Sequence, residues 1–281
     1  MKVKAILLAA ALMAAALFSG CSSQPAAQNS AASGTSKTSV AASSEESTAS
    51  QTSTKESTSE SSAEVSQESE AVSSQPTGQP VDTSWFNDAL FIGDSVTLKL
   101  SYYSDTGAVG DAMFLCAGSL GYNNCLWDID REDNVHPVYE GVKYTIFDGA
   151  KMLAPKKILI MLGMNDIGLY GVDGAAEAMQ EVLDKLKESC PEATIYVESV
   201  TPMLENMQLT DLNNTTIPQF NEKAKAIAEE KGCIWLNVAS AMEDGSGNLV
   251  YDYCGDPDAM GLHFSDTGCA VWVDYLKNHV Q

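Results

Sequence analysis

The sequence predicts an α/β fold, a three-layer α/β/α domain built on a mainly five-stranded parallel sheet. Two features of residues 82–281 carry this prediction. Five short apolar runs, each typical of a buried strand, recur along this part of the chain, and helical patterns lie between them. Strands that alternate with helices form a parallel sheet covered on both faces, because each connecting helix packs back onto the sheet.

The individual elements follow from the apolar runs and from helix start and stop signals. Gly232 is a suitable C-cap for one helix, and Ser265 is a suitable N-cap for the last one. The expected strands are the run ending at Ile92 and residues 112–117, 157–162, 194–200 and 233–238, and the other expected helices are residues 144–153, 175–189 and 217–231.

Residues 1–20 have the pattern of a secretory signal peptide. Two lysines precede an apolar run of Ala, Leu and Met, which ends in the sequence LFSGC at residues 17–21. Small residues before a cysteine resemble a bacterial lipobox, although Phe18 stands where leucine is more common. The resemblance implies cleavage after Gly20 and a lipid such as palmitate on Cys21. The alternative is an ordinary signal peptide in which this cysteine has no role.

Residues 21–81 are predicted to be a disordered tether. From residue 22 to about residue 80 the chain consists mainly of Ser, Thr, Ala, Gln and Glu, with no aromatic residue. Such a segment buries too little apolar surface to offset its conformational entropy. With a lipid on Cys21, the tether would hold the domain of residues 82–281 at the extracellular face of the bacterial cell membrane.

The charge of the chain argues against nucleic acid as a partner. The formal net charge is -22, with 38 acidic and 16 basic residues. Nucleic-acid binders need clustered Lys and Arg. The acidity is typical of a soluble domain and would work against anionic substrates. We also expect the domain to be a monomer.

Six cysteines lie in the predicted domain, at positions 116, 125, 190, 233, 254 and 269. An exported domain permits disulfides, and six cysteines allow fifteen pairings, but free buried thiols are a serious alternative. No C-x-x-C pair or clustered His/Cys set indicates a metal site, and no cofactor is expected.

A candidate nucleophile follows the first expected strand. The apolar run before Gly93 is followed by Asp94 and Ser95, and a glycine allows the sharp turn. Ser95 therefore lies near the carboxyl end of a strand, where open α/β sheets bind their ligands. Taken alone the motif is weak, because Gly, Asp and Ser are also ordinary residues of solvated turns.

Two further motifs occur in the same chain order as in a known family. Gly163-Met164-Asn165-Asp166 follows the third strand, and Gly261-Leu262-His263 precedes the last helix. Together with Gly-Asp-Ser they resemble the SGNH or GDSL hydrolase family over residues 82–281. That family also has an Asn-x-Gly-x-x-Gly pattern after its second strand, which residues 116–121 match at Gly118, with Cys116 in place of the asparagine.

The resemblance implies a flavodoxin-like fold and ester hydrolysis through an acyl-serine. Ser95 would attack the acyl carbonyl while His263 removes its proton. The backbone N–H groups of Ser95 and Gly118 and the side-chain amide of Asn165 would hold the oxyanion. Other roles stay open for these residues: Asn165 and Asp166 as a helix N-cap pair, Gly118 as a turn residue, and His263 as a core residue.

The sequence departs from the family at the residue that orients the histidine. Members usually carry an aspartate three residues before it, where this chain has Met260. Asp258 and Asp256 are the nearby substitutes, and we expect Asp258 to complete the triad. The alternative is a Ser-His dyad in which a backbone carbonyl orients the ring of His263.

The segments 122–139 and 203–216 are expected to border the site, because loops at strand ends line such pockets. Tyr122 and Trp127 would stack on a sugar ring or pack in the core. The expected function is that of a serine esterase. O-acetyl groups on glycans or cell-wall polymers are the first candidate substrates, and lipid or simple esters are the next. Two other classes stay open: a catalytically silent surface protein that binds glycans, and a flavodoxin-like module that binds a phosphate or flavin.

Overall fold

The computed structural model describes residues 79–281. The predicted signal peptide, the lipidation at Cys21 and nearly all of the predicted tether lie outside the described residues. Within them, the predicted fold class is confirmed, since five parallel strands form one sheet in the order β2-β1-β5-β6-β7. These strands are β1 (Ala89–Gly93), β2 (Met113–Cys116), β5 (Lys157–Met161), β6 (Thr194–Glu198) and β7 (Ile234–Leu236).

The strand order determines where a ligand can bind. The chain leaves β1 for β2 on one side and then crosses to β5 on the other, so both flank β1. This is the flavodoxin-like order, and its switch point opens a crevice at the carboxyl end of β1. In the register, Phe91 lies beside Phe114 of β2 and Leu159 of β5, so the three strands end at the same edge.

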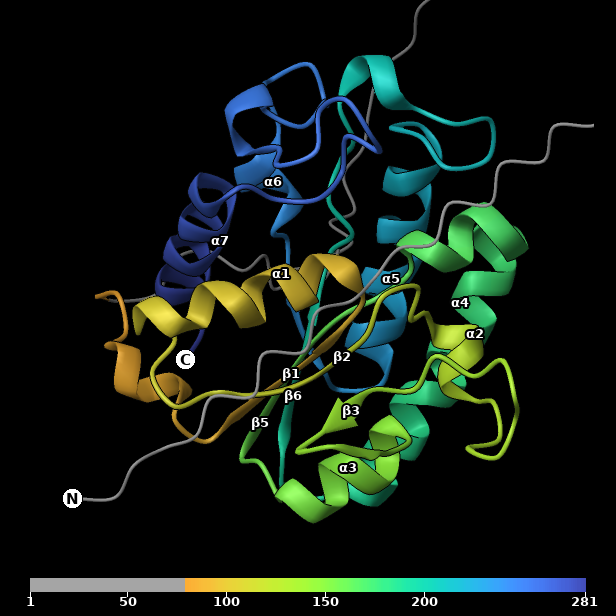
Figure 1. The fold of residues 1–281 in the computed structure, drawn as a ribbon, viewed down its shortest axis with the longest axis vertical. Coiled ribbons are helices and arrows are strands. Elements are labelled where there is room, and N and C mark those ends of the chain that lie inside the picture. Colours follow the sequence, from red (N-terminus) through yellow and green to blue (C-terminus); the bar gives the residue numbers. More distant parts are fainter. Residues whose placement is uncertain (1–78) are drawn as a thin grey trace, which may run out of the picture. The chain divides into compact units, whose positions relative to one another are not determined.

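Helices cover both faces of the sheet. α1 and α7 pack against each other on one face, whereas α4 packs against α3 and α5 on the other (Figure 1). No helix within residues 79–281 is long and apolar enough to span a membrane. The long helices are α1 (Ser95–Tyr103), α3 (Ile146–Leu153), α4 (Met164–Ser189), α5 (Thr216–Glu230) and α7 (Asp266–His279).

The shorter elements lie in the connections. A two-stranded antiparallel hairpin of β3 and β4 was not expected from the sequence. These elements are α2 (Tyr122–Cys125), α6 (Ala239–Met242), β3 (Val138–Tyr139), β4 (Val142–Lys143) and the 3₁₀ turns η1 (Thr83–Phe86), η2 (Ser104–Thr106), η3 (Glu205–Met207) and η4 (Tyr251–Tyr253).

The sequence located most helix ends but missed the beginning of α4. Ser265 caps α7 as expected, because its side chain accepts a hydrogen bond from Gly268 N. α4 begins at Met164 rather than near residue 175, and the helix has a kink at Gly171, where φ is 70°. The glycine-rich first part of α4 obscured the helical pattern there.

The core is built on the central strand. Ala89, Leu90, Phe91 and Ile92 are all fully buried, because helices cover both faces of a parallel sheet. The ring of Phe91 stacks on that of Phe114, with centroids 5.2 Å apart.

All six cysteines of the described residues are free thiols. Five of them are buried, and burial raises the pKa of Cys254 to about 11 and that of Cys269 to about 12. A thiol with such a pKa is almost entirely protonated at neutral pH and is therefore a poor nucleophile.

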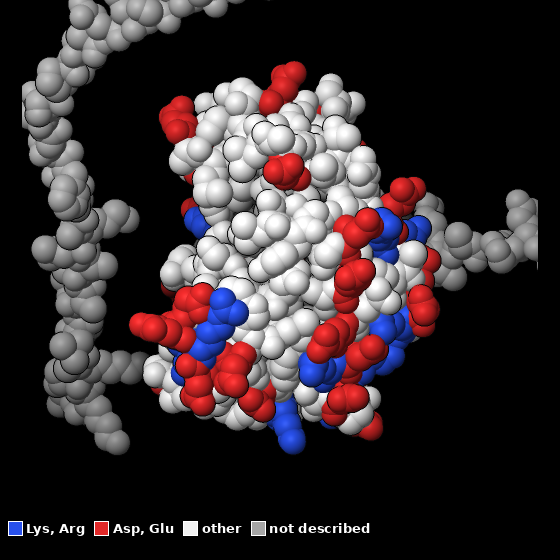
Figure 2. All heavy atoms as spheres, turned by 90° about the vertical axis from the view of Figure 1, so that its right-hand side faces the viewer, with Lys and Arg blue, Asp and Glu red and all other residues white. Residues whose placement is uncertain are grey.

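The surface carries mixed charge with an acidic excess. Figure 2 shows one face on which acidic and basic side chains gather in the lower part, while most of the upper part is uncharged. The basic side chains there are interspersed with acidic ones and form no continuous basic patch on this face.

Glu198, the last residue of β6, is a buried acid in the core. Its side chain is 2 % exposed, and Trp272 Nε1 donates a hydrogen bond of 2.5 Å to Oε2. The other oxygen, Oε1, has no hydrogen-bond partner among the described residues. Burial raises the pKa of Glu198 to about 8, in spite of the bond from Trp272.

This buried acid predicts a pH-dependent stability. Between about pH 4.5 and 8 the unfolded chain loses the Glu198 proton while the folded chain keeps it, so the free energy of unfolding falls as the pH rises. Glu198→Gln removes this loss. From pH 5 to pH 9 the free energy of unfolding of the variant should therefore rise by a few kcal/mol relative to that of the wild type, at about 1.4 kcal/mol for each pH unit over which folded and unfolded wild type differ by one proton. Urea unfolding of both proteins at pH 5 and at pH 9 measures this difference, and Glu192→Gln at an exposed position is the control. A difference that does not change with pH would contradict the prediction.

Candidate active site

Ser95 lies at the turn from β1 into α1. Asp94 is the N-cap of α1, because its Oδ1 accepts a hydrogen bond of 2.9 Å from Val96 N. Ser95 is therefore the first residue of the helix, where backbone N–H groups have no acceptor within the helix. The helix N-terminus places both its hydroxyl and its N–H at the carboxyl edge of the sheet.

His263 connects this serine to an aspartate. His263 Nε2 lies 2.8 Å from Ser95 Oγ, and His263 Nδ1 lies 2.7 Å from Asp256 Oδ2. An ionised carboxylate only accepts hydrogen bonds, so the ring proton is on Nδ1 and the lone pair of Nε2 faces the serine hydroxyl. The three side chains form one continuous chain of hydrogen bonds.

The expectation that Asp258 orients the histidine is wrong in this structure. Asp256 contacts His263 instead, and Asp258 is exposed. The reason is local geometry. An antiparallel bridge joins Cys254 to Phe264, and Gly255 N donates to His263 O at 2.7 Å. This pairing puts the residue after Gly255 beside the histidine, although seven positions separate them in sequence.

The backbone of the same loop encloses the Asp256 carboxylate. Its Oδ1 accepts hydrogen bonds of 3.1 Å from Leu262 N and from His263 N, and Oδ2 accepts one of 3.3 Å from Met260 N. Partial burial alone would raise the pKa of Asp256. The bonds from His263, Cys254 and the backbone outweigh it and lower the pKa. The carboxylate is therefore charged at neutral pH.

Asn165 lies at the start of α4 and contacts Asp94, the residue before Ser95. Its Nδ2 donates to Leu120 O at 2.9 Å and to Asp94 Oδ2 at 3.3 Å. The amide thus bridges the turn after β1 and the loop after β2. Gly163, which precedes the helix, has a φ of 123°, and a Cβ there would lie 2.5 Å from the ring of Phe220. Only glycine permits this turn, which brings Asn165 to the sheet edge.

The loop that carries Gly118 is held by the next residue of α4. Asp166 is 1 % exposed, and its carboxylate accepts hydrogen bonds from Tyr122 N at 2.7 Å and Asn123 N at 2.8 Å. A Cβ on Gly121 would lie 2.5 Å from this carboxylate. Gly118 follows β2, the strand beside β1, so its backbone lies at the same sheet edge as Ser95.

Asp94 is a buried acid directly behind the candidate nucleophile. Its side chain is 2 % exposed, and burial raises its pKa to about 7, although the bond from Val96 N acts in the opposite direction. Sequence reasoning gave this residue no role. Its second oxygen is the one that holds the Asn165 amide.

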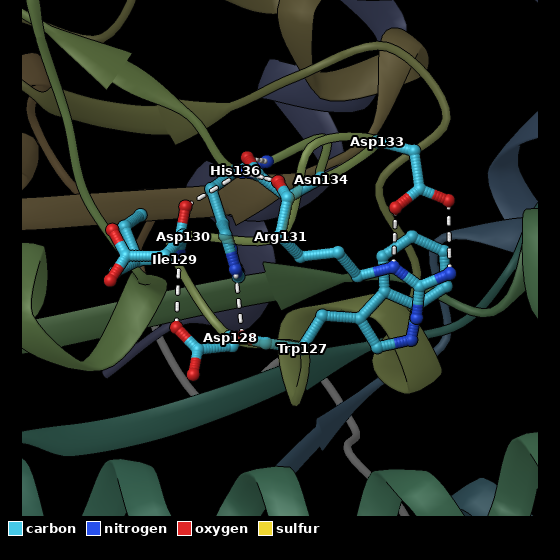
Figure 3. Close-up of polar contacts among 8 residues, drawn as sticks. All are labelled: Trp127, Asp128, Ile129, Asp130, Arg131, Asp133, Asn134 and His136. Carbon is cyan, nitrogen blue, oxygen red and sulfur yellow. Dashed lines mark hydrogen bonds and ion pairs between the residues drawn. The ribbon is translucent and has the colours of Figure 1, made fainter.

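Tyr122 and Trp127, the two aromatic residues expected at the site, pack against other parts of the protein. Tyr122 is 1 % exposed and belongs to the core. The guanidinium of Arg131 lies 3.6 Å from the ring centroid of Trp127 and also pairs with Asp133 (Figure 3). One face of the indole is thus covered by Arg131. His136 is buried and connects the two ends of this loop, with Nε2 3.0 Å from Trp127 O (Figure 3).

The segment 203–216 contacts the loop that carries Asp256 and His263, but none of its residues lines the cleft beside Ser95. Leu204 N donates to Gly261 O at 2.8 Å. No group of three or more His, Cys, Asp or Glu side chains within residues 79–281 is arranged to hold a metal ion.

The sequence matches the family model of the GDSL-like lipase/acylhydrolase family over residues 91–271. The chain belongs to this family. A multidomain esterase of Ruminococcus flavefaciens is 28 % identical over 140 residues, which are 48 % of this chain and 17 % of the relative. The chain thus spans less than a fifth of that relative's length.

A solved structure shares the fold of this family member. It is a protein of Streptococcus pneumonia described as a candidate platelet activating factor, with a TM-score of 0.52 and 20 % identity. The match covers 73 % of this chain and 86 % of that one.

The contact between Asp256 and His263 predicts a large effect of an isosteric change. In Asp256→Asn the amide would favour the tautomer with the proton on Nε2, which cannot accept the serine proton. We expect kcat for p-nitrophenyl acetate to fall by up to about ten-thousandfold, as in serine proteases. Asp258→Asn, in the same loop, is the control and should cost less than about twofold. Equal losses in the two variants would contradict the assignment.

The position of Asn165 predicts an effect on turnover. Loss of one oxyanion donor typically lowers kcat about a hundredfold to a thousandfold. Asn165→Ala should do so with little change in KM for p-nitrophenyl acetate. Asn124→Ala is the control, because its amide also holds the loop after β2, through Ser119 O at 2.7 Å. A loss confined to KM in Asn165→Ala would mean that the amide only binds substrate.

Proposed function

We propose that this family member is a serine esterase that hydrolyses carboxylic esters through an acyl-serine intermediate. One observation carries the proposal, namely the chain of hydrogen bonds from Ser95 through His263 to Asp256, with contacts of 2.8 and 2.7 Å. A serine hydroxyl is inert without a base, and a histidine is an effective base when a carboxylate orients it and stabilises its charged form.

The reaction has two steps. Ser95 Oγ bonds to the acyl carbon while its proton passes to His263 Nε2, and the tetrahedral intermediate collapses as the C–O bond to the alcohol breaks. The alcohol oxygen takes the proton from Nε2 as it leaves. Water then attacks the acyl-serine with His263 again as the base, which releases the acid and restores the hydroxyl.

The negative charge of each intermediate would be held by three donors. They are the backbone N–H groups of Ser95 and Gly118 and the Asn165 amide. Asn165 Nδ2 lies 3.3 Å from Asp94 Oδ2 and 2.9 Å from Leu120 O, so the N–H that faces Asp94 makes the weaker hydrogen bond and is the more available to an oxyanion. The two backbone N–H groups are fixed by the chain and stabilise developing charge without reorganisation.

The substrate proposed is an O-acetyl ester on a glycan or cell-wall polymer. A lipid on Cys21 and the tether after it would keep the enzyme at the extracellular face of the cell membrane, within reach of such polymers. The similarity to a multidomain esterase supports ester chemistry. A catalytically silent protein was suggested by Met260, which replaces the usual aspartate. Asp256 supplies a carboxylate at His263 in its stead, which supports an active enzyme.

The proposal is tested with Ser95→Ala. The variant should keep less than about one ten-thousandth of the wild-type turnover of p-nitrophenyl acetate. Its melting temperature should stay within about 3 °C, because a half-buried hydroxyl contributes little to packing. Ser101→Ala is the matched control, since its hydroxyl lies on the same helix and donates to Leu98 O at 2.7 Å. Turnover that survives in Ser95→Ala would refute the proposal.

A further inference from the structure

A cleft of about 550 Å³ opens beside Ser95, between α1 and the segment that precedes α7. Its α1 wall is one face of the helix, because residues three, four and seven positions apart lie on the same side. That wall is formed by Ser95, Leu98, Lys99 and Tyr102, and the opposite wall by Gly255, Asp256, His263, Phe264 and Ser265.

The place of the cleft indicates which half of an ester it receives. Ser95 and His263 line it, whereas Gly118 and Asn165 are not among its lining residues. The acyl oxygen must face the oxyanion donors, and the alcohol must leave beside the histidine that protonates it. The cleft therefore lies on the alcohol side of the scissile bond.

We propose that this cleft is the subsite for the alcohol half of the ester, and that the alcohol is a neutral oligosaccharide that packs against Tyr102. The inference rests on the proposed esterase function and names its substrate class. From Ser95 to Tyr102 the helix rises about 10 Å, at about 1.5 Å per residue. This length exceeds a single sugar ring.

Tyr102 provides the surface that a sugar ring needs. Its side chain is 66 % exposed, so the ring is not part of the core. The flat face of an aromatic ring offers apolar surface to the C–H face of a sugar, and the phenol hydroxyl can bond a sugar hydroxyl. Leu98, half-buried between Ser95 and Tyr102 on the same helix face, extends the apolar surface toward the reacting atoms.

Lys99 distinguishes a sugar from an alkyl chain. Its Nζ donates to Asp266 Oδ1 at 2.5 Å, and an ammonium group has three donors, so two remain for sugar hydroxyls. An alkyl chain over Lys99 would cover these donors without offering an acceptor, which is costly. The ion pair with Asp266 is neutral and the chain carries -22, so an anionic alcohol gains no attraction.

The test compares three acetate esters that share the acyl group and differ in the alcohol: O-acetylated cellotetraose, octyl acetate and p-nitrophenyl acetate. Full-length wild type, Tyr102→Ala and Tyr251→Ala are assayed. Tyr251 is the matched control, since it is 65 % exposed and is not among the lining residues of the cleft. The quantity measured is kcat/KM for each ester divided by that for p-nitrophenyl acetate.

We expect the ratio for the acetylated cellotetraose to fall about tenfold in Tyr102→Ala and to keep its wild-type value in Tyr251→Ala. The ratio for octyl acetate should not fall. A cellotetraose ratio that is the same in all three proteins, or a fall seen with octyl acetate instead, would overturn the subsite.

Failure of the esterase function itself would be seen separately, as absence of p-nitrophenyl acetate turnover in the wild type. In that case the subsite is tested by measuring oligosaccharide binding instead of turnover. Unacetylated cellotetraose titrated into the same three proteins and followed by NMR should bind about tenfold more weakly to Tyr102→Ala than to the other two. Equal Kd values would overturn the subsite independently of catalysis.

Discussion

The hydrogen bonds accepted by the Asp256 carboxylate hold the candidate site together. One oxygen binds two backbone N–H groups of the loop that ends at His263, and the other binds the imidazole. The same group therefore shapes the loop and sets the tautomer of the histidine. Because these bonds also keep the carboxylate charged, the base is oriented before any substrate arrives.

The sheet supplies the second half of the arrangement. β1 and its two neighbours end at one edge, and each is followed by a polar group of the site: Ser95 after β1, Gly118 after β2 and Asn165 after β5. This geometry places two acidic side chains in the interior. Asp94 and Asp166 lie below the surface, and burial raises the pKa of both, yet their hydrogen bonds connect the three strand ends.

The sequence predicted the parts of this structure that depend on local pattern. Apolar runs located all five strands of the sheet, the polar motifs pointed to Ser95, Asn165 and His263, and the family resemblance pointed to Gly118. The sequence did not predict contacts that depend on pairing between segments of the folded chain. The partner of His263 depends on the bridge between residues 254 and 264 and not on a count of positions, so Asp258 was preferred to Asp256. Tyr102 was missed as well, because a helix face becomes a cleft wall only once another segment lies opposite it.

The central claim is that His263 makes the Ser95 hydroxyl nucleophilic, and reaction with a fluorophosphonate probe tests it most directly. The probe reacts with an activated serine and needs no knowledge of the substrate. Intact mass and peptide mapping should give a single adduct, on Ser95 in the wild type, and His263→Ala should label at least about a hundredfold more slowly. An adduct at another serine, or labelling of Ser95 at the same rate without the histidine, would contradict the account.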